Sequence, residues 1–132
     1  MLLMKLKTPE KFAFLKLAHY VANIDGEFER EEQSVIEEYC AEMGIENIRP
    51  DFEKFNFEEI LSQITTLKSQ KIIILELMIL VHSDDKFHRF EHEVIDRIAY
   101  FYNISKKDLD IFSQWGKTAS ALYTQGNLFI EN

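Results

Sequence analysis

The chain repeats part of itself after 59 positions. Four residues of the first copy recur at matching places in the second: Asp25 as Asp84, Phe28 as Phe87, Arg30 as Arg89, and Glu32 as Glu91. The agreement continues to Ile45 in the first copy and Ile104 in the second. Repeated apolar residues are expected when two helices face one core, but repeated carboxylates at a fixed spacing are not. The pattern therefore predicts two similar halves, over about residues 9–45 and 68–104.

Helix signals are dense along the chain, whereas strand signals are scarce. Apolar residues recur at helical spacing in six segments, at about residues 9–23, 30–43, 56–67, 72–81, 88–102 and from 105 onward. Thr8, Asn56 and Ser105 are typical helix starts, and Gly44 is a typical helix end. We expect an all-α, single-domain bundle of about six to seven helices spanning 1–132. Its two helix–acidic turn–helix repeats should be related by a pseudo-two-fold axis.

The run 72–81 is the most apolar stretch, and only Glu76 interrupts it. Its composition also suits a buried strand, but no neighbouring strand candidate exists to pair with it. When the two repeats are aligned with the shift of 59 positions, this run also matches the first predicted helix. A helix that is apolar on all sides belongs at the centre of a bundle. A bilayer needs about 20 apolar residues, so we expect no transmembrane segment.

Two features lie further along the chain. Trp115 lies on the apolar face of the last predicted helix, and we expect it to anchor the core. The tail after Gly116 is apolar enough to dock on the bundle, but its residues show no clear period.

Negative charge is concentrated in one part of the chain. The net charge is −8, and residues 25–59 contain thirteen acidic residues and three basic ones. Such a surface repels phosphate backbones, which argues against nucleic acid and suits a cation or a basic protein surface. A solvated helix face would have the same composition.

The cellular compartment follows from two further observations. The single cysteine, Cys40, falls on an apolar stripe and is expected to be a buried, inert thiol. The first residues lack the long apolar stretch of a signal peptide. We therefore expect a soluble, cytoplasmic protein.

The repeated acids predict a candidate metal site. If the two turns meet, up to five carboxylates surround one place: Asp25, Glu32, Asp84, Asp85 and Glu91. Crowded carboxylates repel one another unless a hard cation such as Ca²⁺, Mg²⁺ or Mn²⁺ lies among them. In the alternative, the two turn aspartates cap the following helices, and the two glutamates pair with Arg30, Arg89 or backbone donors.

Two known motifs fit the chain only in part. With Gly26 as the turn glycine of an EF-hand loop, Val21 takes the first ligand position and offers no side-chain oxygen. His88 and His92 fit the H-x-x-E-H pattern of inverted zinc proteases, but the first repeat lacks both histidines. They are also spaced to share an adventitious zinc or nickel ion. We name no catalytic residue and expect no enzyme. A hydrolase that uses paired carboxylates is the least favoured of the three functions considered, after the two binding functions described below.

The repeat resembles the TerB-like tellurite-resistance family, which includes the N-terminal domain of a membrane-attached J-domain co-chaperone. The residues that carry the resemblance are Ala22, Asp25, Gly26, Phe28, Glu32, Gly44 and Ile45, echoed by Asp84, Phe87, Glu91, Asn103 and Ile104. The resemblance spans about residues 9–115. It implies an all-α bundle with paired acidic turns, in proteins linked to stress response and interaction complexes. Asp85 departs from the pattern because it replaces the second turn glycine.

Two functions follow as expectations. The first is a small stress-related module that binds a divalent cation or an unknown protein partner through its acidic turns. The second is a pure protein–protein interaction module whose acidic residues only cap helices. A homodimer is compatible with both.

Overall fold

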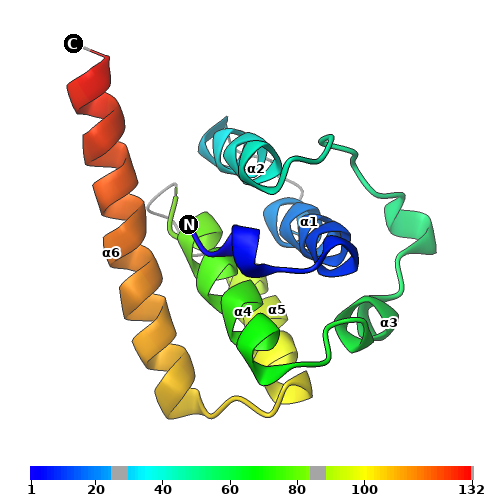
Figure 1. Cartoon of the computed structure of the whole chain (residues 1–132). Helices are drawn as coiled ribbons and strands as arrows, with labels where there is room; N and C mark the ends of the chain where they lie inside the picture. The colour runs from blue at the N-terminus through cyan, green and yellow to red at the C-terminus, as the bar shows by residue number, and fades with distance from the viewer. Residues whose placement is uncertain (25–29, 84–88, 132) are drawn as a thin grey trace.

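The computed structural model describes residues 1–24, 30–83 and 89–131, and these residues form helices and connecting segments without a strand (Figure 1). The α-helices are α1 (Thr8–Asn23), α2 (Arg30–Met43), α3 (Phe57–Ser62), α4 (Leu67–Val81), α5 (Arg89–Phe101) and α6 (Lys106–Ile130). Two short 3-10 helices, η1 (Leu3–Lys5) and η2 (Phe52–Lys54), complete the elements. The prediction of a single all-α bundle is confirmed.

The centre of the bundle is α4, as its apolar sequence predicts. It contacts α1, α2, α5 and α6, and Ile73, Leu77 and Leu80 are completely buried (Figure 1). Burying one such side chain stabilises the fold by about 1.5–3 kcal/mol. No helix in the described part of the chain is long and apolar enough to cross a membrane.

Side-chain caps set several helix starts. The side chains of Asn56, Thr66 and Ser105 each accept a hydrogen bond from the backbone N–H three residues further on, at 3.1–3.2 Å. The caps at Asn56 and Ser105 were predicted, but the cap at Thr66 was not. The helix α3 ends at Ser62, and Leu67 is the first residue of α4, where it is exposed rather than on the inner side of the third helix. The prediction of a helix over 56–67 was therefore wrong at its C-terminal end.

Both repeats end their second helix in the same way. Gly44 and Asn103 have φ angles of +69° and +60°, the left-handed conformation that ends many helices. The following N–H groups reach back over the last turn, from Ile45 to the carbonyl of Cys40 (3.1 Å) and from Ile104 to the carbonyl of Ala99 (2.8 Å). Asparagine tolerates this conformation better than most residues. The pseudo-two-fold axis between the halves stays a prediction.

The irregular segment between α2 and α3 is attached to α1. Tyr20 stacks on Phe55 with ring centroids 4.6 Å apart. Nε2 of His19, whose side chain is buried, lies 2.8 Å from Oδ1 of Asn47. These contacts explain how residues 45–56 stay on the bundle with only the short η2 helix.

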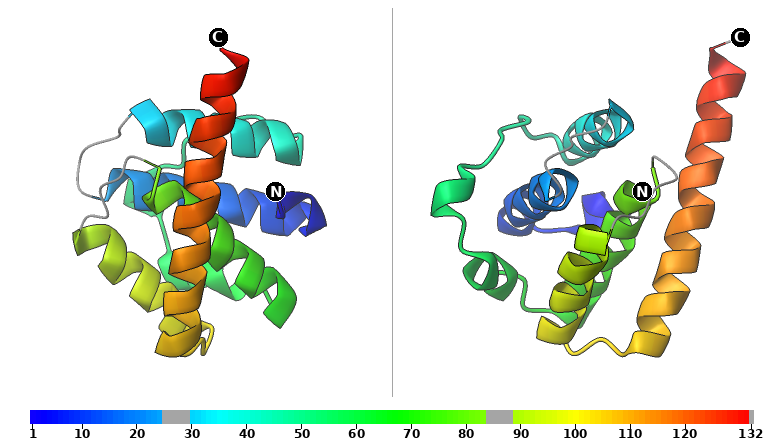
Figure 2. Two further views of the ribbon diagram at one scale, coloured as in Figure 1. Left: turned by 90° about the vertical axis from the view of Figure 1, so that its left-hand side faces the viewer. Right: turned by 180° about the vertical axis from the view of Figure 1, so that it is seen from behind.

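The last helix, α6, is longer than predicted. It continues through Gly116 to Ile130, and only its C-terminal end stands beyond the rest of the bundle (Figure 2). A Cβ atom at Gly116 would lie 2.4 Å from Cβ of Met78, so this glycine lets α6 approach α4 closely. Trp115 is half-buried and is not part of the apolar core, which corrects the prediction of a core anchor.

Candidate functional site

The predicted metal site lies largely outside the described residues. Asp25, Asp84 and Asp85 belong to the segments that the structure does not describe. Glu32 and Glu91 are 3% and 2% exposed, at the starts of α2 and α5. Among the described residues, no group of three or more His, Cys, Asp or Glu side chains is placed to hold a metal ion. A cation site shared by the two acidic turns therefore stays a prediction.

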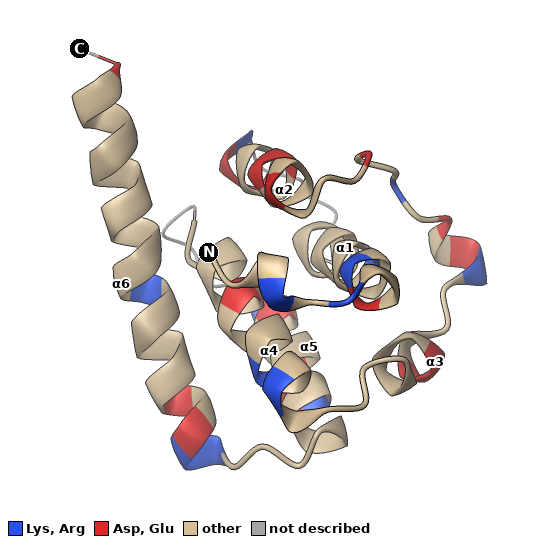
Figure 3. Cartoon of the chain, in the orientation of Figure 1, with Lys and Arg blue, Asp and Glu red and all other residues tan. Residues whose placement is uncertain are grey.

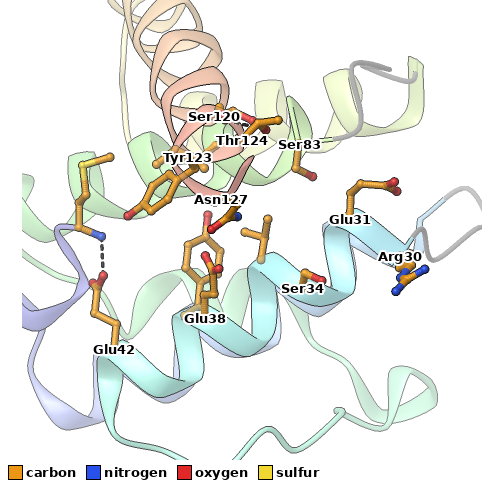
Figure 4. A pocket seen from close by; sticks show the side chains of 14 residues that line it. Arg30, Glu31, Ser34, Glu38, Glu42, Ser83, Ser120, Tyr123, Thr124 and Asn127 are labelled. Carbon is orange, nitrogen blue, oxygen red and sulfur yellow. Dashed lines mark hydrogen bonds and ion pairs between the residues drawn. The ribbon is translucent and has the colours of Figure 1, made fainter. Parts of the chain in front are cut away.

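A cleft of about 350 Å³ lies between α2 and α6 (Figure 4). From α2 come Ser34, Glu38 and Glu42, which are four residues apart and therefore share one face of the helix. From α6 come side chains spaced by three or four residues: Ser120, Tyr123, Thr124 and Asn127. The cleft thus joins two helices that are far apart in the sequence, and Ile79 of α4 also lines it.

The α2 wall of the cleft is acidic. Glu31, Glu38 and Glu42 line it, and Arg30 is the only cationic side chain among the lining residues. Arg30 lies at the end of the cleft opposite Glu42 (Figure 4). Within the described chain, neither Glu31 nor Glu38 forms an ion pair. Two carboxylates, those of Glu31 and Glu38, therefore line the cleft without an ion pair to any described residue.

Glu42 differs from the other two because it has partners at the far end of the cleft. Its Oε1 lies 2.5 Å from the ammonium nitrogen of Met1, and its Oε2 accepts from the N–H of Leu3 at 2.8 Å (Figure 4). Burial works to lower the pKa of this ammonium, but the hydrogen bond to Glu42 and the charge of Glu76 outweigh it and raise the pKa. Glu42 thereby holds η1 against α2.

Glu76 lies beneath the end of the cleft where Glu42 meets Met1, and its side chain is completely buried. Its Oε1 accepts from the N–H of Leu2 at 2.7 Å, whereas Oε2 has no hydrogen-bond partner in the described part of the chain. Tyr39, which lines the cleft, donates its hydroxyl to the carbonyl of Glu76. Burial raises the pKa of the Glu76 carboxyl above its ordinary value of 4.5, despite the hydrogen bond from Leu2.

The raised pKa of Glu76 predicts how stability changes with pH. The folded protein holds the Glu76 proton to higher pH than the unfolded chain does, so stability is lost as the pH rises from 4.5 through the folded-state pKa. Glu76→Gln keeps an acceptor for Leu2 without the buried charge. We expect the variant to be the more stable protein at neutral pH, with the difference shrinking towards pH 4.5. Urea unfolding of both proteins between pH 4.5 and neutral pH measures the difference in their free energies of unfolding. If the wild type becomes more stable relative to the variant as the pH rises, the raised pKa of Glu76 is contradicted.

Sequence reasoning did not find this cleft. The nearest signal in the sequence is Glu76, the single charge inside the most apolar run, and it lies beneath the cleft rather than in its lining. Cys40, in contrast, is buried as predicted, and burial raises the pKa of its thiol. His92, one of the two histidines of the protease-like motif, is exposed, and His88 lies outside the described residues.

No known protein family, curated protein or solved structure matches this chain. The resemblance to the TerB-like family therefore still rests on the short motifs around the two turns. The geometry of the cleft carries the functional conclusion instead.

Proposed function

We propose that the protein is a non-enzymatic interaction module, and that its α2–α6 cleft binds a basic segment of a partner protein. The observation that carries this proposal is the pair of carboxylates, Glu31 and Glu38, that line a cleft of about 350 Å³ without an ion pair in the described part of the chain. Binding pockets for small ligands and side chains typically start at about 300 Å³. This volume is large enough for one or two lysine or arginine side chains.

The sign of the charge selects the ligand. Three glutamates against Arg30 and the Met1 ammonium leave the lining of the cleft with a net negative charge, within a chain whose net charge is −8. Complementary charge of this kind speeds association and selects against acidic partners. Nucleic acids and phosphorylated ligands are repelled by the same field.

The spacing of the carboxylates favours a peptide over a single metal ion. Side chains three or four residues apart on a helix have Cβ atoms about 5–6 Å apart, so Glu31, Ser34 and Glu38 form a row along α2. A row of acceptors matches successive cationic side chains. Tyr39 and Tyr123 supply apolar surface for the stems of those side chains, and the Asn127 amide can bond a peptide backbone.

A calorimetric titration tests the proposal. The probe is a short peptide of alternating arginine and alanine, with alternating glutamate and alanine as the charge-reversed peptide. We expect the basic peptide to bind and its affinity to fall as salt rises. Glu38→Gln should weaken binding by about two- to fivefold, as expected for the loss of one partly exposed ion pair.

The matched control is Glu37→Gln. Glu37 is also exposed on α2 and carries the same charge, but it does not line the cleft. The proposal requires that this control leave the affinity within error of the wild type. If both variants weaken binding equally, the peptide responds to overall charge and the cleft is not its site.

A further inference from the structure

One end of the α2–α6 cleft already holds a cation that belongs to the chain itself. The ammonium nitrogen of Met1 lies 2.5 Å from Oε1 of Glu42 and 3.2 Å from Oε1 of Glu76. Met1 and Glu42 line the cleft, whereas Glu76 is completely buried beneath it. Two carboxylates from two different helices therefore hold one primary ammonium, the same group that ends a lysine side chain.

The segment that carries this ammonium has further attachments to the bundle. The N–H of Leu2 donates to Oε1 of Glu76 at 2.7 Å, and the N–H of Leu3 donates to Oε2 of Glu42 at 2.8 Å. The side chain of Leu3 is completely buried in the core. Removing the charge of the Met1 amine should therefore leave η1 in place.

The Met1 ammonium reduces the charge that the cleft offers to a basic partner. Acidic residues gather along α2 (Figure 3), and the described residues that line the cleft carry five charges, on Glu31, Glu38, Glu42, Arg30 and the Met1 amine. The lining therefore has one net negative charge with the ammonium and two without it. A cationic side chain that approaches Glu42 must compete with an ammonium that is already bound there.

We propose that Glu42 and Glu76 form a primary-ammonium site, that the Met1 ammonium occupies it as an internal competitor, and that a lysine of the basic partner enters it when this charge is removed. The ligand is a lysine because its ammonium is compact, like that of Met1, whereas the guanidinium of arginine is planar and wider. This inference rests on the proposed function, since it names a regulation of the same cleft.

Calorimetric titration of the full chain, with and without an acetyl group on the Met1 amine, tests the proposal. An N-terminal acetyltransferase moves the acetyl group from a thioester to the amine and releases a thiol and a proton, so the charge is lost and one N–H remains. The probe is a peptide of alternating lysine and alanine. We expect the acetylated protein to bind it about two- to fivefold more tightly, the effect of one more partly exposed ion pair. In Glu42→Gln the gain should be smaller, because the freed acceptor is missing.

Lys5→Gln is the matched control, because it removes one positive charge from an exposed position of η1 that does not line the cleft. It should leave the affinity for the lysine peptide within error of the wild type. Equal affinities of the acetylated and unmodified proteins would overturn the proposal, as would a gain in Lys5→Gln as large as the gain on acetylation. The arginine–alanine peptide separates the two failures: if it binds while acetylation has no effect, only the ammonium site is wrong, and if neither peptide binds either protein, the proposed function fails as well.

Discussion

Replacing Phe14 with alanine is expected to lower the free energy of unfolding by about 3–5 kcal/mol, the usual cost of deleting a buried phenylalanine. Phe14 is completely buried in α1 and meets the ring of Tyr39 edge-on, with centroids 5.1 Å apart. Tyr39 in turn lines the cleft and bonds the backbone of α4. The truncation therefore leaves a cavity directly behind the cleft wall.

Phe14→Leu is the control for this effect. It keeps most of the apolar volume and should cost less than about 1.5 kcal/mol, provided the core repacks. Chemical unfolding followed by circular dichroism measures both variants. Equal losses for alanine and leucine would mean that the contact between Phe14 and Tyr39, rather than filled volume, sets the stability at this position.

Replacing Gly116 with alanine should destabilise the protein by about 1–3 kcal/mol, although alanine is the better helix former. The new methyl group would lie 2.4 Å from Cβ of Met78 and 2.8 Å from its carbonyl carbon. Backbone atoms cannot turn aside, so α6 must shift away from α4. Because α6 forms one wall of the cleft, the same variant should also bind the basic peptide less tightly.

Gly126→Ala is the matched control, because it makes the same change in the same helix with open space around it. It should leave stability unchanged or raise it by up to about 1 kcal/mol. Thermal unfolding of the two variants and the wild type measures the difference in stability. A Gly116→Ala protein as stable as the wild type would show that α6 is not closely packed on α4.

The sequence predicted the helices best where local chemistry decides the structure. The bounds of α2 and the caps at Asn56 and Ser105 follow from short-range patterns, and they agree with the structure. The course of α6 was missed because the residues after Gly116 show no clear helical period. The role of Gly116 is a close approach to Met78, a residue far away in sequence, and no local pattern records that contact.

The cleft could not be predicted for a related reason. Glu38 and Tyr123 line the same cleft only because α2 and α6 both pack on α4. In the sequence, a row of glutamates on α2 is indistinguishable from a solvated helix face. The acidic turns gave the more visible signal, but only Glu32 and Glu91 of that group lie in the described residues.

The most direct test of the proposed function is to map where a basic ligand binds. Isotope-labelled protein is titrated with the arginine–alanine peptide, and backbone amide shifts are followed by nuclear magnetic resonance. The account predicts that the largest shifts occur together on α2 and α6, at Ser34 and Glu38 and at Tyr123 and Asn127. Shifts confined to other acidic positions, such as Glu53 and Glu58, with none on α6, would contradict it.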